Sequence, residues 1–465
     1  MLSPTRTAAV ARLLAAAFAL YGLVATAFLA IEIPPFQNPD EPNHFLRAAQ
    51  VADGGLVGTR FDVTQADGSV RAMAGGRADP ALMAAFAPFD PVRFHPEIHV
   101  AQSMWAPQIG WSDARAPTLF PNTAVYPPVF YIPSALGIGV GREAGLTVVQ
   151  TLMVSRLLTG AAAVVVGTVA IGCAGTVAVW LFAVMTLPTS LSLIASTSPD
   201  ALLLACSALA AALLVRGLRA PLPVSAAART WLVVMLCLVT AARSSYCGLV
   251  LLPLALTRMP ARWRVLAMAV IAASVAAWSA IAAATALTNF GASQGTDPAA
   301  QMALLLRDPL LALQVARDTL TLNWQAYLEG FIGRLGWLDT PLPPCYRAAA
   351  AAMLGVAAVA AMLAGRGERL RAGSRLVIAA AVLISAVGVF AALYLGWTVP
   401  GHATVDGVQG RYFLPLVLVA GAALPAIGAA RWMRLHDALV LAVAAFPVVS
   451  LGVVMHAVVL RYYLG

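Results

Sequence analysis

Long apolar runs separated by short polar stretches dominate the pattern of this chain. Several runs approach the roughly 20 residues that a helix needs to cross a bilayer. The pattern predicts spanning helices at about 8–31, 148–171, 176–195, 201–215, 265–287, 348–364, 376–395, 412–429 and 438–460. We therefore expect an all-α polytopic membrane protein, one integral membrane domain over residues 1–465. It should have about 9–12 membrane helices, with short re-entrant or hairpin segments included.

Two apolar stretches are too short for an ordinary crossing. The stretch "YPPVFYIPSALGIGVG", residues 126–141, predicts a re-entrant or interfacial helix, and whether it spans the membrane stays open. Residues 229–264 carry arginines at both ends and two short apolar halves. This predicts a hairpin that dips into the membrane with Arg243 near its tip. An arginine at that depth is either a functional group or a residue that snorkels or pairs inside the bundle.

Two polar segments are much longer than the connections of about 2–8 residues that usually join packed helices. The first, residues 32–126, is rich in proline and glycine and is expected to be functional or a small domain. In the second, residues 288–346, apolar residues near helical spacing alternate with charges. That pattern predicts helices that lie on the membrane surface.

Arginines near the start of the chain indicate its orientation. Arg6 and Arg12 precede or open the first apolar run, so the positive-inside rule predicts a cytoplasmic N-terminus and two extracytoplasmic loops. The same run could be a signal peptide cleaved after "ATA". It is longer than an ordinary signal-peptide core, which favours an uncleaved anchor.

Composition supports the membrane class and excludes others. The chain is 61% hydrophobic and 11% charged, with a mean hydropathy of +0.83, which a soluble domain of this length does not have. The net charge of +9 comes from arginines at the ends of apolar runs, typical of topology signals and headgroup contacts rather than nucleic-acid binding. Four of the five cysteines lie within apolar runs, so we expect packing residues and no structural disulfide.

Polar residues that call for an explanation gather on the expected outer side, at or near span ends. They are Asp40, Glu41, His44, Arg47, Asp200, Arg334, Trp337, Asp339, His402, Asp406, Gln409 and Arg411. Asp40 and Glu41 either offset the dipole of a following helix or serve as a general base and an orienting acid. Arg411 and Arg156 either snorkel to lipid or hold a phosphate. Trp337 belongs either to an aromatic belt or to a platform that stacks on sugar.

Five sequence blocks carry a family resemblance. They are "PPFQNPDEPNHFLRAAQ" (34–50), "YPPVFYIP" (126–133), "TSPDALLLA" (197–205), "GRLGWLDTPLP" (333–343) and "GVQGRYFLPL" (407–416). In that order they resemble the signature blocks of the domain of unknown function 2142 family of bacterial membrane proteins. That family is grouped with the glycosyltransferase C superfamily, multi-span enzymes that use polyprenyl-linked sugar donors.

The resemblance implies site residues. Members of the superfamily place a catalytic acid in the first extracytoplasmic loop, where Asp40 and Glu41 stand here. Tyr126 stands where that block usually has a histidine, so a role of that histidine does not carry over to this chain. Arg243 matches a basic hairpin residue that is usually a lysine. The residues expected to bind substrate or phosphate are His44, Arg47, Arg156, Asp200, Arg243, Trp337, Asp339, Gln409, Arg411 and Tyr412.

The resemblance also implies an activity. A sugar would pass from a polyprenyl-phosphate donor to a glycan, lipid or protein acceptor of the cell envelope, at the outer face of the bacterial inner membrane. Asp40 would act as base, and Glu41 would either orient the acceptor or assist Asp40. Arg411, Arg156 and Arg243 would hold the phosphate. The sequence has no metal-ligand cluster, so we expect neither metal nor cofactor, although some relatives with lipid-diphosphate donors use a divalent metal.

Two other functions fit the same sequence. A transporter or flippase of lipid-linked glycans would have polar residues at mid-membrane depth and broken helices related by a repeat. A scaffold for envelope assembly would need no catalytic residue.

Overall fold

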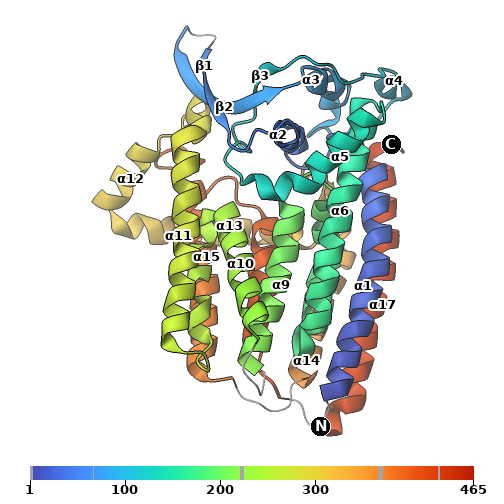
Figure 1. Ribbon diagram of the computed structural model, residues 1–465, viewed down its shortest axis with the longest axis vertical. Helices are drawn as coiled ribbons and strands as arrows, with labels where there is room; N and C mark the ends of the chain where they lie inside the picture. The colour runs from blue at the N-terminus through green and yellow to red at the C-terminus, as the bar shows by residue number, and fades with distance from the viewer. Residues whose placement is uncertain (1–3, 66–67, 220–224, 365–369, 428–429, 465) are drawn as a thin grey trace.

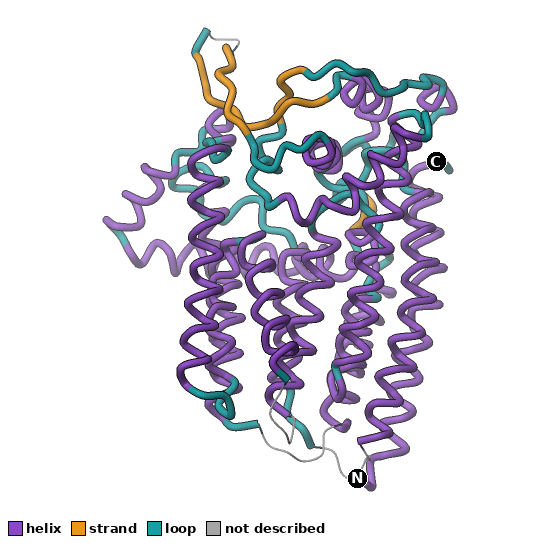
Figure 2. Tube along the Cα trace, viewed as in Figure 1, coloured by secondary structure: helices purple, strands orange, loops and turns teal. Residues whose placement is uncertain are grey.

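The protein is a bundle of membrane-length helices capped at one end by the first long loop (Figures 1 and 2). The computed structural model describes residues 4–65, 68–219, 225–364, 370–427 and 430–464. The N-terminus lies at the uncapped end, here called the N-terminal end, and the C-terminus lies beside the cap (Figure 1). The capped end is called the loop end.

Seven helices of the described residues are long and apolar enough to cross a membrane. They are α1 (Pro4–Glu32), α6 (Val148–Cys173), α9 (Asp200–Arg219), α11 (Ala261–Thr285), α14 (Pro344–Ala364), α15 (Ala372–Gly396) and α17 (Met433–Tyr462). The most apolar window of α9 is 83% buried and that of α11 only 11%, so α9 is central and α11 faces outward. The predicted all-α polytopic class is confirmed.

The predicted continuous span at 176–195 is wrong. The segment consists of η3 (Gly175–Val177), α7 (Ala178–Met185) and α8 (Pro188–Ile194), with a bend of 80° between α7 and α8. Pro188 has no N–H to donate and disfavours helical backbone at Leu187, which is extended at φ −60° and ψ 143°. Counted as one span, this broken pair is the eighth crossing.

The predicted hairpin is present. Its limbs are α10 (Ala226–Ala242) and the 3₁₀ segment η4 (Ser244–Ala255), joined at Arg243, whose backbone is extended. Gly248 and Gly388 let η4 pack closely on α15, because a Cβ at either glycine would clash with backbone across the contact. The hairpin begins and ends at the N-terminal end of the bundle, where α11 also starts (Figure 1), so Arg243 lies toward the loop end.

The predicted span at 412–429 is also wrong in form. The segment is η6 (Gly410–Phe413), α16 (Leu414–Ala420) and η7 (Gly421–Ala423), and Ala429 lies outside the described residues. The indole of Trp180 packs where a side chain at Gly421 would lie, and its Nε1 donates to the Val417 carbonyl at 3.0 Å. Leu424 is extended before Pro425, so the helix stops early. With this segment and the two hairpin limbs, the membrane segments fall within the predicted range.

The first long loop and the short apolar stretch that follows it fold into the cap. Its elements are α2 (Glu41–Ala52), β1 (Thr59–Thr64), β2 (Val70–Ala78), α3 (Ala81–Phe86), η1 (Ala87–Val92), α4 (Gln102–Trp105), β3 (Ala116–Leu119), η2 (Pro128–Tyr131) and α5 (Ile132–Glu143). The strands form an antiparallel sheet in the order β1-β2-β3. Phe36, Phe45 and Phe120 are among the buried side chains of its apolar core. The 12-residue α5 is too short to span, in agreement with the predicted re-entrant or interfacial helix.

The second long loop carries two helices that are not counted among the spans. Its elements are η5 (Phe290–Gln294), α12 (Pro298–Arg307), α13 (Pro309–Ile332), β4 (Arg334–Leu335) and β5 (Thr340–Pro341). Outside this loop, the short helix η8 (Ala430–Trp432) precedes α17. Asp297 and Asp308 cap α12 and α13 by accepting hydrogen bonds from first-turn N–H groups. Figure 1 shows α12 projecting from the side of the bundle.

Candidate functional site

The backbone of Asp40 is unusual for an aspartate at a helix start. Asp40 is the N-cap of α2, yet it has left-handed backbone angles (φ 57°, ψ 12°) and its side chain makes no capping hydrogen bond. Aspartate at an N-cap ordinarily accepts a hydrogen bond from the first turn, from an extended backbone. The carboxylate is thus not used to stabilise α2. Strained backbone of this kind tends to occur at functional sites.

The Asp40 carboxylate instead contacts two polar side chains from distant parts of the chain. Asn122 Nδ2 donates to Oδ1 at 3.1 Å, and Arg411 Nη2 lies 3.4 Å from Oδ2. Asn43 orients the Asn122 amide by donating to its Oδ1 at 2.6 Å. The Asp40 side chain remains 38% exposed, so it is held in place and still accessible.

A second ion pair lies next to the first. Arg243 Nη2 contacts Asp200 Oδ1 at 2.5 Å. The guanidinium carbons of Arg243 and Arg411 lie 4.7 and 5.4 Å from the centre of the Tyr412 ring, so both arginines flank one aromatic side chain. We call Asp40, Asp200, Arg243, Arg411 and Tyr412 the Asp40 cluster.

Interrupted membrane segments bring the Asp40 cluster together. Asp200 is the first residue of α9, Arg243 joins the limbs of the hairpin, and Arg411 lies in the 3₁₀ turn before α16. Tyr246 fixes two of these segments to each other, because its hydroxyl donates to the Tyr412 carbonyl at 2.7 Å. Non-helical backbone at membrane depth is tolerated only where protein buries it or where it lines a cavity.

Three polar atoms around the cluster are buried without a hydrogen-bond partner among the described residues. They are Arg243 Nε, Arg411 Nε and Gln409 Oε1. Leaving such groups unsatisfied costs on the order of 1–3 kcal/mol each, so buried orphans in a native fold call for an explanation. Two donors and one acceptor around the Asp40 cluster therefore have no partner within the part of the chain that the structure describes.

Glu41 and Arg156 pair with each other inside the protein. Both side chains are fully buried, and Arg156 Nε donates to Glu41 Oε1 at 2.8 Å while Nη2 contacts Oε2. The remaining Arg156 donors go to the carbonyls of Ala30, Ile33 and Pro34. Every Arg156 donor group is engaged within the protein, so a phosphate contact at Arg156, expected from the sequence, is not available. Glu41 likewise does not face the accessible space that Asp40 faces.

His44 is a buried imidazole near the Asp40 cluster. Its Nδ1 is 2.9 Å from the Tyr131 hydroxyl. Burial lowers the pKa of His44 to about 4, against the opposing effect of Asp40 and Asp200. His44 is therefore neutral near pH 7 and does not present a charge to phosphate. Burial likewise raises the pKa of Tyr131 well above its ordinary value, so its hydroxyl stays protonated.

Arg47 serves the cap rather than the expected phosphate. Its guanidinium is buried and donates to Gln50 Oε1 and to the carbonyls of Gly55, Leu56 and Tyr126 at 2.6–3.2 Å. These bonds fasten α2 to the loops on either side. Both terminal nitrogens of Arg47 are engaged by these contacts, and its buried Nε has no partner among the described residues.

Trp337 and Asp339 form a separate group. Trp337 Nε1 donates to the Phe36 carbonyl at 3.0 Å, and Asp339 Oδ2 accepts from Arg461 Nη2 at 2.7 Å. Trp337 also packs against Phe94, with ring centroids 5.1 Å apart. The expected sugar-stacking surface is therefore occupied by protein, and the "GWLD" block ties the first loop to the end of α17.

The other residues expected on the outer side contact partners that are not part of the Asp40 cluster. His402 and Asp406 form an exposed pair, with Nδ1 of the histidine 3.1 Å from Oδ2 of the aspartate. Nη1 of Arg334 lies 3.8 Å from Oε2 of Glu329. Among the residues that the structure describes, no group of three or more His, Cys, Asp or Glu side chains is arranged to hold a metal ion.

Three residues of the site were not predicted from the sequence. Asn43 and Asn122 fix the Asp40 carboxylate, and Tyr246 ties the hairpin to the 407–416 block. The available signal was their position, since Asn43 lies in the first signature block and Asn122 shortly before the second. Nothing in the sequence showed that the two amides meet.

A family comparison covers most of the chain. The model of the DUF2142 family, described as a predicted membrane protein, matches residues 23–420, and the chain belongs to this family. No curated protein and no solved structure matches the chain.

Proposed function

We propose that this member of the DUF2142 family is a membrane glycosyltransferase. It would transfer a sugar from a polyprenyl-phosphate-linked donor to an acceptor hydroxyl of the cell envelope. The observation that carries the proposal is Asp40, an accessible carboxylate that caps no helix and lies 3.4 Å from an arginine with a buried, unpartnered Nε.

In the proposed reaction Asp40 acts as a general base. Its carboxylate takes the proton of the acceptor hydroxyl as that oxygen forms a bond to the anomeric carbon of the donor. The bond from the anomeric carbon to the phosphate oxygen breaks, and its electron pair leaves with polyprenyl phosphate. The anomeric configuration is inverted, because one displacement occurs on the face opposite the leaving group.

Arg411 and Arg243 would bind the phosphate and offset its growing charge. Each has a buried Nε without a partner, and both flank Tyr412. Planar guanidinium groups suit phosphate oxygens, and their effect is largest in a site that excludes water. Asp200 would keep Arg243 in position, and the unpartnered Gln409 Oε1 would accept from a sugar hydroxyl.

Glu41 and Arg156 would act as positioning residues. Their buried pair fixes the first turn of α2 and the end of α1, which sets where Asp40 stands. This assignment replaces the roles expected for them from the sequence, an assisting acid and a phosphate ligand. No metal or cofactor is required by the proposed displacement, because polyprenyl phosphate is already a good leaving group.

We also propose that the loop end faces the extracytoplasmic side of a bacterial inner membrane. The helices and connections at the other end carry arginines, which favours a cytoplasmic N-terminal end. These arginines include Arg6, Arg12, Arg216, Arg219, Arg229, Arg258, Arg371 and Arg431. Sugar donor, acceptor and Asp40 would then meet at the outer leaflet.

Broken membrane segments favour a second candidate, a transporter or flippase of lipid-linked glycans. The 80° bend between α7 and α8 and the short segment Gly410–Ala423 are features of transporters with discontinuous helices. Such a protein would move the donor between leaflets without breaking the sugar–phosphate bond.

One reconstitution separates the two. Purified native protein is placed in liposomes with fluorescently labelled polyprenyl-phosphate sugars and an envelope extract, and released polyprenyl phosphate is measured. Release that requires the native protein supports the transferase. Movement of labelled lipid between leaflets without release would favour the flippase and overturn the first proposal.

A further inference from the structure

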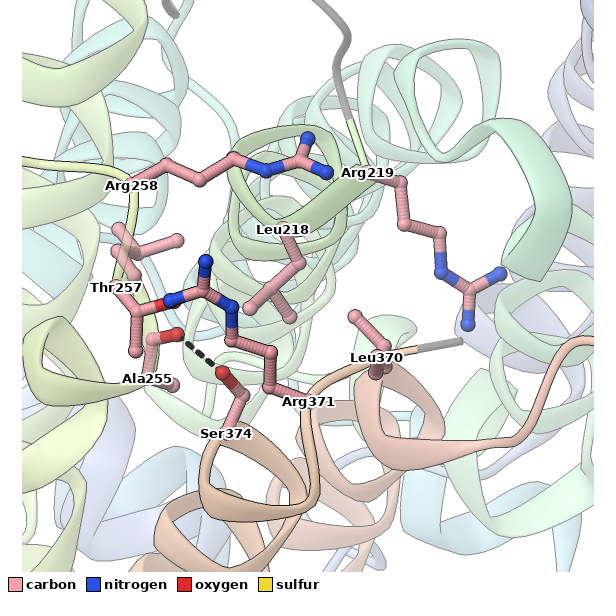
Figure 3. A pocket seen from close by; sticks show the side chains of 10 residues that line it. Leu218, Arg219, Ala255, Thr257, Arg258, Leu370, Arg371 and Ser374 are labelled. Carbon is pink, nitrogen blue, oxygen red and sulfur yellow. Dashed lines mark hydrogen bonds between the residues drawn. The ribbon is translucent and has the colours of Figure 1, made fainter. Parts of the chain in front are cut away.

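A pocket lies at the N-terminal end of the bundle, far along the bundle axis from the Asp40 cluster. Three segments wall it: the last turn of α9, the chain that follows η4, and the start of α15 (Figure 3). Its lining residues are Gly217, Leu218, Arg219, Ala255, Leu256, Thr257, Arg258, Leu370, Arg371 and Ser374. We call it the arginine pocket.

The arginine pocket has an apolar base and a cationic rim. Leu218, Leu256 and Leu370 are at most 9% exposed, whereas Arg258 and Arg371 are exposed. The lining includes three arginines and no acidic side chain. Its volume of about 110 Å³ is several times the roughly 10–15 Å³ needed for one water, so a phosphate-sized group fits.

The walls of the pocket are fixed to each other. The hydroxyl of Ser374, in the first turn of α15, donates to the Ala255 carbonyl at 2.7 Å (Figure 3). Arg219 points away from Arg258 and Arg371 in Figure 3, and its guanidinium donates to Thr176 Oγ1 and to the Leu424 carbonyl. Arg219 therefore helps to fix the wall, and Arg258 and Arg371 line the pocket with it.

The start of α15 adds to the positive potential. Arg371 is the N-cap of this 25-residue helix, whose first N–H groups and dipole favour an anion at that end. Arg371 Nη1 contacts Thr257 Oγ1 at 3.3 Å, which holds the guanidinium beside the chain after η4. Basic pockets between membrane helices on the cytoplasmic side are suited to phosphate headgroups.

We propose that the arginine pocket binds a phosphate-bearing group, with Arg258 and Arg371 on the phosphate. The apolar base would meet the first carbons attached to that phosphate. Two sources share this chemistry, an anionic lipid headgroup of the adjacent leaflet and a soluble phosphate. The proposal does not depend on the activity proposed at the Asp40 cluster.

The test measures binding to the purified full-length chain in a neutral detergent. The probes are short-chain phosphatidylglycerol, zwitterionic phosphatidylcholine of the same chain length, and inorganic pyrophosphate, followed by native mass spectrometry and thermal unfolding. We expect phosphatidylglycerol or pyrophosphate to bind and to raise the unfolding temperature above the value with phosphatidylcholine. Each arginine removed from the pocket should weaken that binding about tenfold, the loss of one hydrogen bond to a charged group.

The variant Arg258→Gln with Arg371→Gln tests the pocket itself. Its matched control is Arg12→Gln with Arg431→Gln, which removes the same charge from exposed positions at the same end. The proposal stands if the pocket variant loses binding and the control keeps it. Equal loss in both variants would show diffuse attraction to basic surface and overturn it, as would equal binding by native and pocket variant.

The probes also distinguish the source of the phosphate. Stabilisation by phosphatidylglycerol alone assigns the pocket to a lipid headgroup, and stabilisation by pyrophosphate alone assigns it to a soluble phosphate. Binding of neither probe overturns the proposal. Should the double variant aggregate, Arg371→Gln and Arg371→Lys are compared singly, since Arg371 is exposed and its change leaves the apolar base intact. Lysine should then retain more binding than glutamine.

Discussion

Asp40 and Glu41 are neighbours in the chain, but their carboxylates lie in opposite environments. The Glu41 carboxylate is fully buried against Arg156, whereas that of Asp40 is 38% exposed and lies beside Arg411. The left-handed backbone at Asp40 separates the two directions. One acid of the pair is therefore part of the buried structure, and the other is accessible from outside the protein.

The first prediction concerns Asp40. Asp40→Asn should lower the release of polyprenyl phosphate about 10²–10⁴-fold, the usual effect of a general base, while leaving the unfolding temperature nearly unchanged. Asp62→Asn, which removes an exposed acid from β1 of the same loop, should keep full activity. An Asp40→Asn variant that releases polyprenyl phosphate at the native rate would exclude Asp40 as the base.

The second prediction concerns the buried pair of Glu41 and Arg156. Glu41→Gln leaves the Arg156 charge buried without its partner, which typically costs about 3–5 kcal/mol. We expect a marked fall in unfolding temperature in detergent, and a smaller additional loss when Arg156→Gln is combined with it. Fully additive losses would show that the two side chains do not depend on each other.

An ion pair on the surface supplies the control for this comparison of single and double variants. Nη2 of Arg317 lies 2.8 Å from Oδ1 of Asp318, and the two side chains are 72% and 34% exposed. Exposed pairs contribute at most about 1 kcal/mol. Asp318→Asn should therefore leave the unfolding temperature within a small margin of the native value.

The sequence predicts the membrane class, the hairpin and the place of Asp40, because hydropathy and arginine positions depend on local composition. It misses the break at Pro188 and the early end of the segment Gly410–Ala423. An apolar run of sufficient length looks the same whether or not it is broken, and the close packing at Gly421 depends on Trp180, a residue far away in the chain. The cap's sheet is missed for a related reason, since its strands are short and its core residues come from the whole loop.

The candidate site was predicted in part for similar reasons. The positions of Asp200, Arg243 and Arg411 at span ends suggested a common location, and the structure does bring them together with Asp40. The roles of Arg156, Arg47 and Asp339 depend on what fills their surroundings. An arginine that binds carbonyl groups and one that binds phosphate have the same sequence pattern, so spacing does not distinguish them.

The third prediction is a pH dependence of stability. The pKa of His44 is about 4 in the folded protein and near 6.5 when exposed. Between these values the unfolded chain binds a proton that the folded chain does not, so stability falls as pH falls from about 6.5 to 4. Above pH 7 both states are neutral at His44, and this contribution is constant.

The check compares the native protein with His44→Gln by thermal unfolding from pH 4 to pH 8. Glutamine does not titrate, so the variant should lose less stability on acidification than the native protein does. The remaining slope, which comes from other groups, is common to both proteins. Parallel curves over the whole range would show that burial of His44 does not produce the dependence.

The last prediction concerns Asn122, a residue that positions Asp40. Its Nδ2 donates to Asp40 Oδ1 at 3.1 Å, and Asn43 fixes the direction of the amide. Asn122→Asp removes that donor and puts a second carboxylate beside Asp40, which favours keeping one proton on the pair. The acid limb of the pH–rate profile should therefore move to higher pH.

Asn122→Ala, which removes the donor without adding charge, should lower the rate and move the limb less. A purely structural role would lower the rate or the unfolding temperature in both variants and leave the acid limb where it is in the native protein.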